Sequence, residues 1–175
     1  MLYALDKLIL IVARVLMVVA GIGLILMMVQ TTMDVAADNL WQHPIPGNLE
    51  IISVYHMVLV VFLPLAFVEW QHENIQVDLL WQVLPRLLQR LSLIFGYLLG
   101  AGFFAILAWQ TYLDAINALA KNELMMGNVY VMVWPAKFVL PVGFASIFLV
   151  SMRHAAHAVF DPDFEPFPPA DPESL

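Results

Sequence analysis

Four long apolar stretches, separated by short polar segments, dominate the chain. A helix needs about 20 residues to cross a hydrocarbon layer of about 30 Å. The uncharged runs Val15–Met33, Ile51–Val68 and Leu91–Leu113 are close to this length or exceed it. With a fourth stretch near the C-terminus, they predict an all-α membrane protein with four transmembrane helices. The expected spans are residues 8–33, 51–68, 91–113 and 135–152.

The fourth span is extended at its N-terminal end to reach membrane length. Its uncharged run, Phe138–Met152, has only 15 residues. Pro135 suits the first position of a helix, where its missing N–H removes no hydrogen bond. A helix that begins there places Lys137 in its first turn, and the long side chain can reach the membrane interface.

Basic residues near the ends of the spans predict the orientation. Five lie on one side of the membrane (Lys7, Arg14, Arg86, Arg90 and Arg153) and two on the other (Lys121 and Lys137). Cytoplasmic segments carry the excess of Lys and Arg. The N- and C-termini are therefore expected in the cytoplasm, and residues 34–50 in the periplasm. The first span is interpreted as a retained anchor, because its apolar run exceeds the 7–15 residues of a signal-peptide core.

A different pattern lies between the second and third spans. Apolar side chains recur with helical spacing from Val77 to Leu91, and polar ones such as Asp78 and Arg86 occupy the opposite face. This pattern predicts an amphipathic in-plane helix over about residues 75–90, with a bend at Pro85. A cytoplasmic helix packed on a partner protein is the alternative interpretation.

Composition supports a membrane location. Hydrophobic residues make up 62% of the 175 residues and charged residues 12%, about half the charged share of a soluble domain. The absence of cysteine excludes disulfides, thiolate metal sites, iron–sulfur clusters and disulfide-exchange enzymes. The net charge is −7, but five of the acids lie between Asp161 and Leu175. We expect a membrane domain over residues 1–158 and a disordered, acidic, proline-rich cytoplasmic tail over residues 159–175.

Two residues at the periplasmic edge are candidates for a specific role. Glu50 opens the second span, either as a first-turn acid favoured by the helix dipole or as a site for a cation or a base of a partner chain. Lys137 carries the opposite charge on the same side of the membrane, so a Glu50–Lys137 pair is geometrically possible.

His56 is the only histidine inside the expected spans. It could be a haem ligand or a proton carrier. Di-haem four-helix cytochromes, however, need several histidines at depth on facing helices. The other four histidines (His43, His72, His154 and His157) lie outside the expected spans. A hydrogen bond from His56 to a neighbouring helix is therefore favoured.

The other polar and small residues indicate contacts rather than chemistry. Asp78, with Glu69 and Glu73, is expected on a solvated interface at the cytoplasmic end of the second span. Gly96 and Gly100 form a GxxxG motif, which lets helix backbones approach closely in lipid. No Ser-His-Asp grouping, phosphate-binding loop or pair of intramembrane acids occurs in the sequence. We therefore expect neither an enzyme nor a solute path through this chain alone.

Several motifs together resemble a known family. Ile45-Pro46-Gly47-Asn48-Leu49-Glu50 precedes the second span, and Glu73-Asn74-Ile75-Gln76-Val77-Asp78 follows it, with Leu84-Pro85 behind. Trp134-Pro135 and Leu140-Pro141-Val142-Gly143-Phe144 mark the last span. In order and spacing, over residues 5–158, they resemble the small, DctQ-like membrane subunit of tripartite ATP-independent periplasmic (TRAP) transporters. One departure is Asn74, where the family usually has a histidine; His72 lies two positions earlier.

The resemblance implies a non-catalytic subunit in the bacterial inner membrane. Its partners would be a large permease subunit, which carries the substrate and sodium sites, and a periplasmic binding protein that delivers organic acids or similar solutes. Glu50 and Asp78 match motif positions, and structural or subunit-contact roles are expected for both. Residues 34–50 and 114–134 are candidate contacts for the binding protein. No cofactor is expected in this chain.

Two other classes remain as alternatives. An anchor subunit for electron transfer predicts a haem absorbance band that is lost in the His56→Ala variant. A free-standing channel or homo-oligomer predicts function without any partner chain.

Overall fold

The computed structural model describes residues 2–71, 86–127 and 129–160. The helices are α1 (Leu2–Trp41), α2 (Asn48–Ile51), the π-helix η1 (Ile52–His56), α3 (Met57–Phe62), α4 (Leu65–Trp70), α5 (Arg86–Ala120), α6 (Trp134–Lys137) and α7 (Val139–Phe160). Strands β1 (Leu124–Met125) and β2 (Val131–Met132) form an antiparallel hairpin between α5 and α6. The expected in-plane helix, with Asp78, lies outside the described residues except for its last five positions, which begin α5. Most of the acidic tail, residues 161–175, also lies outside them.

Within the described residues, four helical segments are long and apolar enough to cross a membrane, as predicted. They are Asp6–Trp41, Asn48–Trp70, Leu88–Ala120 and Trp134–Val159. Each includes one of the expected spans entirely and extends beyond it. The prediction of four helices able to cross a membrane is therefore confirmed for this part of the chain.

Two helices continue well beyond the predicted ends of their spans. Helix α1 has 40 residues and α5 has 35, which correspond to about 60 and 52 Å. Residues 34–41, expected in a periplasmic segment, are helical because neither glycine nor proline occurs between Gly23 and Pro44. Helix α5 ends where Asn122 takes a left-handed backbone conformation and the Glu123 N–H donates to the Ala118 carbonyl, the Schellman pattern.

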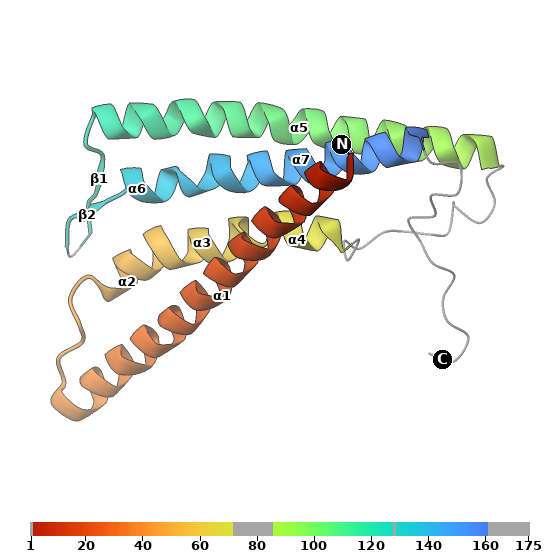
Figure 1. Cartoon of the computed structure of the whole chain (residues 1–175). Coiled ribbons are helices and arrows are strands. Elements are labelled where there is room, and N and C mark those ends of the chain that lie inside the picture. Colours follow the sequence, from red (N-terminus) through yellow and green to blue (C-terminus); the bar gives the residue numbers. More distant parts are fainter. Residues whose placement is uncertain (1, 72–85, 128, 161–175) are drawn as a thin grey trace, which may run out of the picture.

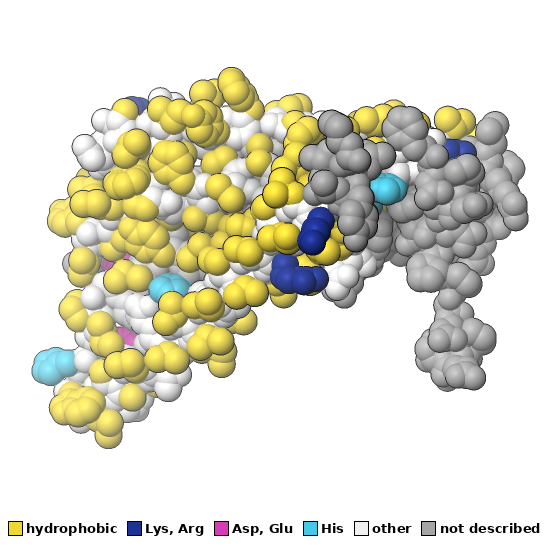
Figure 2. All heavy atoms as spheres, viewed as in Figure 1, with side chains coloured by type: hydrophobic (Ala, Val, Ile, Leu, Met, Phe, Trp, Pro, Cys, Tyr) yellow, Lys and Arg dark blue, Asp and Glu magenta, His cyan; other side chains and the backbone are white. Residues whose placement is uncertain are grey.

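The helices are arranged in a row rather than in a closed bundle. Helix α5 packs along α7, α3 and α4 pack against another side of α7, and α1 crosses α4 and α3 obliquely (Figure 1). We compared the most apolar stretch of 18 residues in each span. In the span that contains α7, 44% of this stretch is buried inside the protein, whereas in the span formed by α5 only 6% is buried. Helix α7 is therefore central, and hydrophobic side chains cover much of the surface (Figure 2).

The second span is interrupted twice. It contains the π-helix η1, and it breaks between α3 and α4 at Pro64, which has no N–H to continue the ladder. Gly143 of α7 lies against this break: a Cβ atom built on it would be 2.6 Å from the Phe62 carbonyl oxygen. The Phe62 and Phe144 rings meet edge to face, with centroids 5.3 Å apart. A glycine therefore allows the two spans to touch backbone to backbone.

We expect Gly143→Ala to destabilise the chain. The new methyl group would collide with the backbone of Phe62, so α3 and α7 would have to separate, at about 1–3 kcal/mol of unfolding free energy. Thermal unfolding in mild detergent measures the effect. Gly96→Ala is the matched control, because nothing lies within 4 Å of its Cβ position; equal melting temperatures for the two variants would contradict the close packing.

Candidate functional site

Glu50 lies at the N-terminal end of the second span, in the first turn of α2. Gly47, which precedes α2, has φ 80°, a conformation that glycine adopts without a steric penalty. The turn directs the chain inward, so that Asn48 and Glu50 are both buried, at 4% and 8% exposure. The sequence left two roles open for Glu50, a first-turn acid or a binding site; in the structure its side chain is buried within the protein.

The β1–β2 hairpin covers Glu50. A Cβ atom on Gly127 would be 2.5 Å from Oε1 of Glu50, and one on Gly47 would be 3.0 Å from Val129. Further along the hairpin, the Tyr55 hydroxyl donates to the Met132 carbonyl at 2.5 Å. Val54, Val131 and Ala136 form a small apolar core beneath it. The hairpin, η1 and α6 are thus one packed unit, the hairpin cluster, with the Glu50 carboxyl against Gly127.

Lys137 belongs to the same end of the molecule. Its Nζ lies 2.6 Å from Oε2 of Glu123, at the start of the hairpin. The sequence analysis considered an ion pair between Lys137 and Glu50 as possible. In the structure, Lys137 forms its ion pair with Glu123. Both side chains are about one third to one half exposed, so this pair contributes at most about 1 kcal/mol. Its position links α6 to the end of α5.

His56 is the last residue of the π-helix η1. Its ring is half-buried, and its Nδ1 atom is buried without a hydrogen-bond partner in the described part of the chain. The favoured hydrogen bond to a neighbouring helix is therefore not seen for this nitrogen. π-Helical turns are rare and occur frequently at functional sites.

Gly96 and Gly100 lie on the outer side of α5. No atom lies within 4 Å of a Cβ built on either, so this GxxxG motif joins no two helices of this chain. The small residues of α5 that are buried are alanines, namely Ala101, Ala115 and Ala118. The motif remains accessible to lipid or to another chain.

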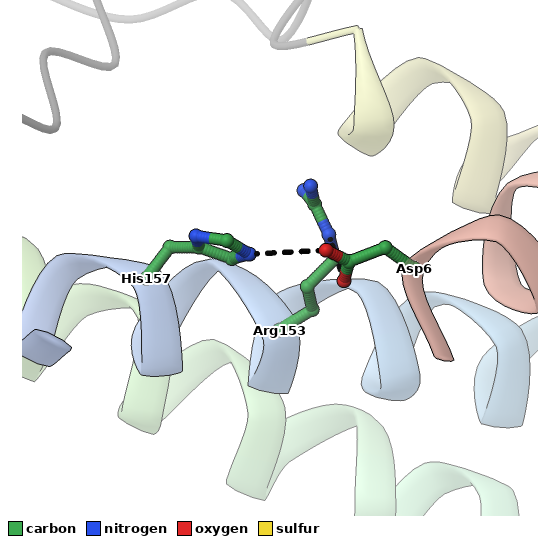
Figure 3. Close-up of polar contacts among 3 residues, drawn as sticks. All are labelled: Asp6, Arg153 and His157. Atoms are coloured by element: carbon green, nitrogen blue, oxygen red, sulfur yellow. Dashed lines mark hydrogen bonds and ion pairs between the residues drawn. The ribbon is translucent and has the colours of Figure 1, made fainter. Parts of the chain in front are cut away.

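A second polar cluster lies at the other end of the molecule. The sequence analysis did not predict it. The Arg153 Nε donates to Oδ1 of Asp6 at 2.7 Å, and Nε2 of His157 lies 3.4 Å from Oδ2 of the same carboxylate (Figure 3). The Arg153 guanidinium also lies 3.9 Å from the centre of the Trp70 ring, a cation–π contact. This cluster, the clasp, joins α1, α4 and α7.

Two further contacts reinforce the same end. Arg90 of α5 donates to the carbonyls of Ala158 and Val159 at 3.0 and 2.7 Å, which places a cation at the negative C-terminal end of α7. His154 is fully buried and stacks on Tyr97 at 5.4 Å. The sequence interpretation placed His154 after the fourth span; it is instead inside α7, because the helix continues to Phe160.

His56 and His154 are far apart. The His154 ring lies 6.3 Å from that of Trp70, and Trp70 is 14 residues beyond His56 along the second span, which corresponds to about 21 Å of helix. His56 and His154 therefore cannot ligate the two faces of one haem. Among the described residues, no group of three or more His, Cys, Asp or Glu is arranged to hold a metal ion.

These features define a small helical membrane protein, held by a polar cluster at each end and without an evident reaction centre in its described part. Its family follows from comparison with known proteins. The family model for tripartite ATP-independent periplasmic transporters, DctQ component, matches residues 27–161. The match covers most of the chain and confirms the resemblance: the chain belongs to this family. No curated protein and no solved structure was matched.

We expect Gly127→Ala to destabilise the chain through Glu50. The new methyl group would occupy the position of the carboxylate, which must then leave its buried site, at about 1–3 kcal/mol. In a Glu50→Ala background the same change should have little effect, because the clash is gone. A double-mutant cycle of thermal unfolding in detergent measures the coupling. Gly102→Ala, with open space around its Cβ position, is the control; additive losses would show that Glu50 and Gly127 do not touch.

Proposed function

We propose that this chain is the non-catalytic small subunit of a sodium-coupled TRAP transporter, and that it serves as a scaffold for the large permease subunit. The complex would take up organic acids or similar solutes delivered by a periplasmic binding protein. The observation that carries the proposal is the family match over residues 27–161, which includes most of the four-span frame.

The placement of charge supports a role without transport chemistry in this chain. The four apolar runs contain no Asp, Glu, Lys or Arg, and the ion pairs of the described residues lie toward the helix ends. A charge in mid-membrane would mark an ion path. The substrate and sodium sites would therefore lie in the large subunit, and no cofactor is proposed here.

The shape supports a scaffold. A row of helices buries one central helix and leaves apolar side chains of α1 and α5 exposed, among them Ile25, Met28, Phe103 and Ile106. These two helices are also longer than one membrane crossing requires. A long, rigid, apolar surface of this kind suits attachment along a larger membrane protein. The expected in-plane helix near residues 75–90 would add a brace at the cytoplasmic interface.

The proposed orientation places the clasp in the cytoplasm and the hairpin in the periplasm of the inner membrane. The contact of Asp6 with Arg153 brings the N-terminus and the end of α7 to one side. Most of the Lys and Arg side chains visible in Figure 2 lie toward this end. The hairpin cluster would then lie on the periplasmic side, and residues 34–50 and 114–134 would face the binding protein.

The test is purification of the tagged chain from native membranes in mild detergent, with mass spectrometry and a visible spectrum of the same sample. We expect a large polytopic membrane protein and no haem band. Glu50→Ala should lower the yield of that partner and the rate of solute uptake, while the chain still inserts, because removal of a buried carboxylate loosens the hairpin cluster by about 1–3 kcal/mol.

Two outcomes would contradict the proposal. A chain that runs alone or only with copies of itself would favour a free-standing protein. A haem band that disappears in His56→Ala would favour an electron-transfer anchor.

A further inference from the structure

Two basic residues share the outer face of α1 near the clasp. Lys7 and Arg14 are seven residues apart, which is close to two helical turns, or about 10.5 Å along the axis. Both are exposed, whereas Ala13 and Ala20, on the side that faces the other helices, are 1% and 3% exposed. The ion pairs of the described residues involve neither cation. The outer face of α1 therefore carries two positive charges that the described part of the chain does not neutralise.

Arg14 lies farther along the membrane-spanning helices than the clasp does. Its neighbour Ala13 packs with Ala66 and Val150 in a small apolar cluster. Val150 precedes Arg153 of the clasp by three residues, so it lies about 4.5 Å nearer to the middle of α7. A charge at such a level is costly unless it reaches the headgroups or meets a counter-ion. Because the side chains of a helix lean toward its N-terminus, Arg14 extends back toward the clasp end of α1.

The nearest acid on α1 is already engaged. Asp6 accepts a hydrogen bond from Arg153 and lies beside His157 in the clasp. The next acid along α1 is Asp34, 20 residues beyond Arg14, which corresponds to about 30 Å of helix. Since no described residue forms an ion pair with Arg14, its counter-ion would come from outside the described part of the chain.

The same face continues as an exposed apolar stripe. Ile11, Val18 and Ile22 are 49%, 56% and 53% exposed, and they lie at helical spacing beside Arg14 and beyond it. Cations at the helix end, followed by branched aliphatic side chains, correspond to the two parts of a phospholipid, a charged headgroup and acyl chains. A soluble anion would neutralise the cations but leave the stripe uncovered. An acidic side chain on another transmembrane helix would bring a second charge to the same depth, at a similar cost.

We propose that Lys7, Arg14, Val18 and Ile22 bind one anionic phospholipid, such as phosphatidylglycerol, on the outer face of α1. The planar guanidinium of Arg14 would hold the phosphate through two hydrogen bonds, and Lys7 would add positive charge nearer to the helix end. An acyl chain would follow Val18 and Ile22. The site needs only this chain and the membrane, so it goes beyond the proposed function and does not depend on it.

Lipid binding to the tagged full chain tests the site. The chain is purified from native membranes in a nonionic detergent, phosphatidylglycerol or phosphatidylcholine is added, and native mass spectrometry measures the bound fraction. We expect phosphatidylglycerol to bind more tightly, and Arg14→Gln or Lys7→Gln to weaken its binding by a factor of about 5, the effect of one cation at an anionic membrane surface. Lys121→Gln, which removes an exposed base after the other end of α5, is the matched control. Equal affinity for the two lipids, or an equal loss in Lys121→Gln, would overturn the proposal.

A photoreactive lipid locates the bound molecule. Phosphatidylglycerol with a diazirine in one acyl chain is added to native membranes, and the labelled peptides are mapped after extraction. We expect label around Val18 and Ile22, and loss of this label in the variant that carries both Lys7→Gln and Arg14→Gln. Label confined to α5 would overturn the proposal. Protection of α1 by another protein in native membranes would overturn it as well.

Ionic strength provides a test that needs no substitution. Because salt screens exposed charges, binding of phosphatidylglycerol to the unmodified chain should weaken as salt is raised, while binding of phosphatidylcholine should stay nearly constant. Both cations are exposed, so the variants should keep the melting temperature of the unmodified chain, and the salt titration decides if they do not. Binding of phosphatidylglycerol that is insensitive to salt would contradict the role of the two cations.

Discussion

The arrangement depends on the packing of three spans around α7. In lipid there is no hydrophobic force between apolar helices, so close approach of backbones and a few polar contacts must hold them together. Gly143 supplies the closest approach, against the carbonyl of Phe62 at the break in the second span. Along the other side of α7, the buried alanines of α5 allow a similar approach. Because α7 is central, α5 and α1 lie on the outside with their apolar sides open.

Polar contacts fix the two ends of this row. At one end, Asp6 brings α1 to α7 through Arg153 and His157, while Trp70 covers the guanidinium. At the other, the hairpin encloses Glu50 and is tied to α6 by Glu123 and Lys137. Charges placed at the ends of long apolar helices avoid the penalty that they would incur in mid-membrane. Between these two ends, the helices are held together by apolar packing.

An open row of helices is a poor arrangement for a protein that works alone but a suitable one for a subunit. It exposes long apolar surfaces on α1 and α5. Together with the membership of the DctQ family, these features direct attention to helix–helix contacts with another membrane chain.

The sequence alone determined the local properties of the chain. Hydropathy predicted four spans in the correct order, because the length of an apolar run reports directly on the thickness of the membrane. The motifs around Gly47, Glu50, Pro135 and Gly143 identified the family. The helix ends were less well predicted, because nothing in hydropathy distinguishes a helix that stops at the interface from one that continues into water, as α1 does to Trp41.

The tertiary structure decided which residues meet. Asp6 and Arg153 are 147 positions apart, and no local spacing connects a charge at the N-terminus with one near the end of the last helix. Glu50 is recognisable in its motif, but its enclosure by Gly127 depends on a hairpin that short, weak strands form only against η1 and α6. The GxxxG motif of α5 was visible in the sequence, yet which side of α5 faces α7 is fixed by packing of Ala101, Ala115 and Ala118. Periodicity describes one helix at a time, whereas contacts depend on how all of them fit together.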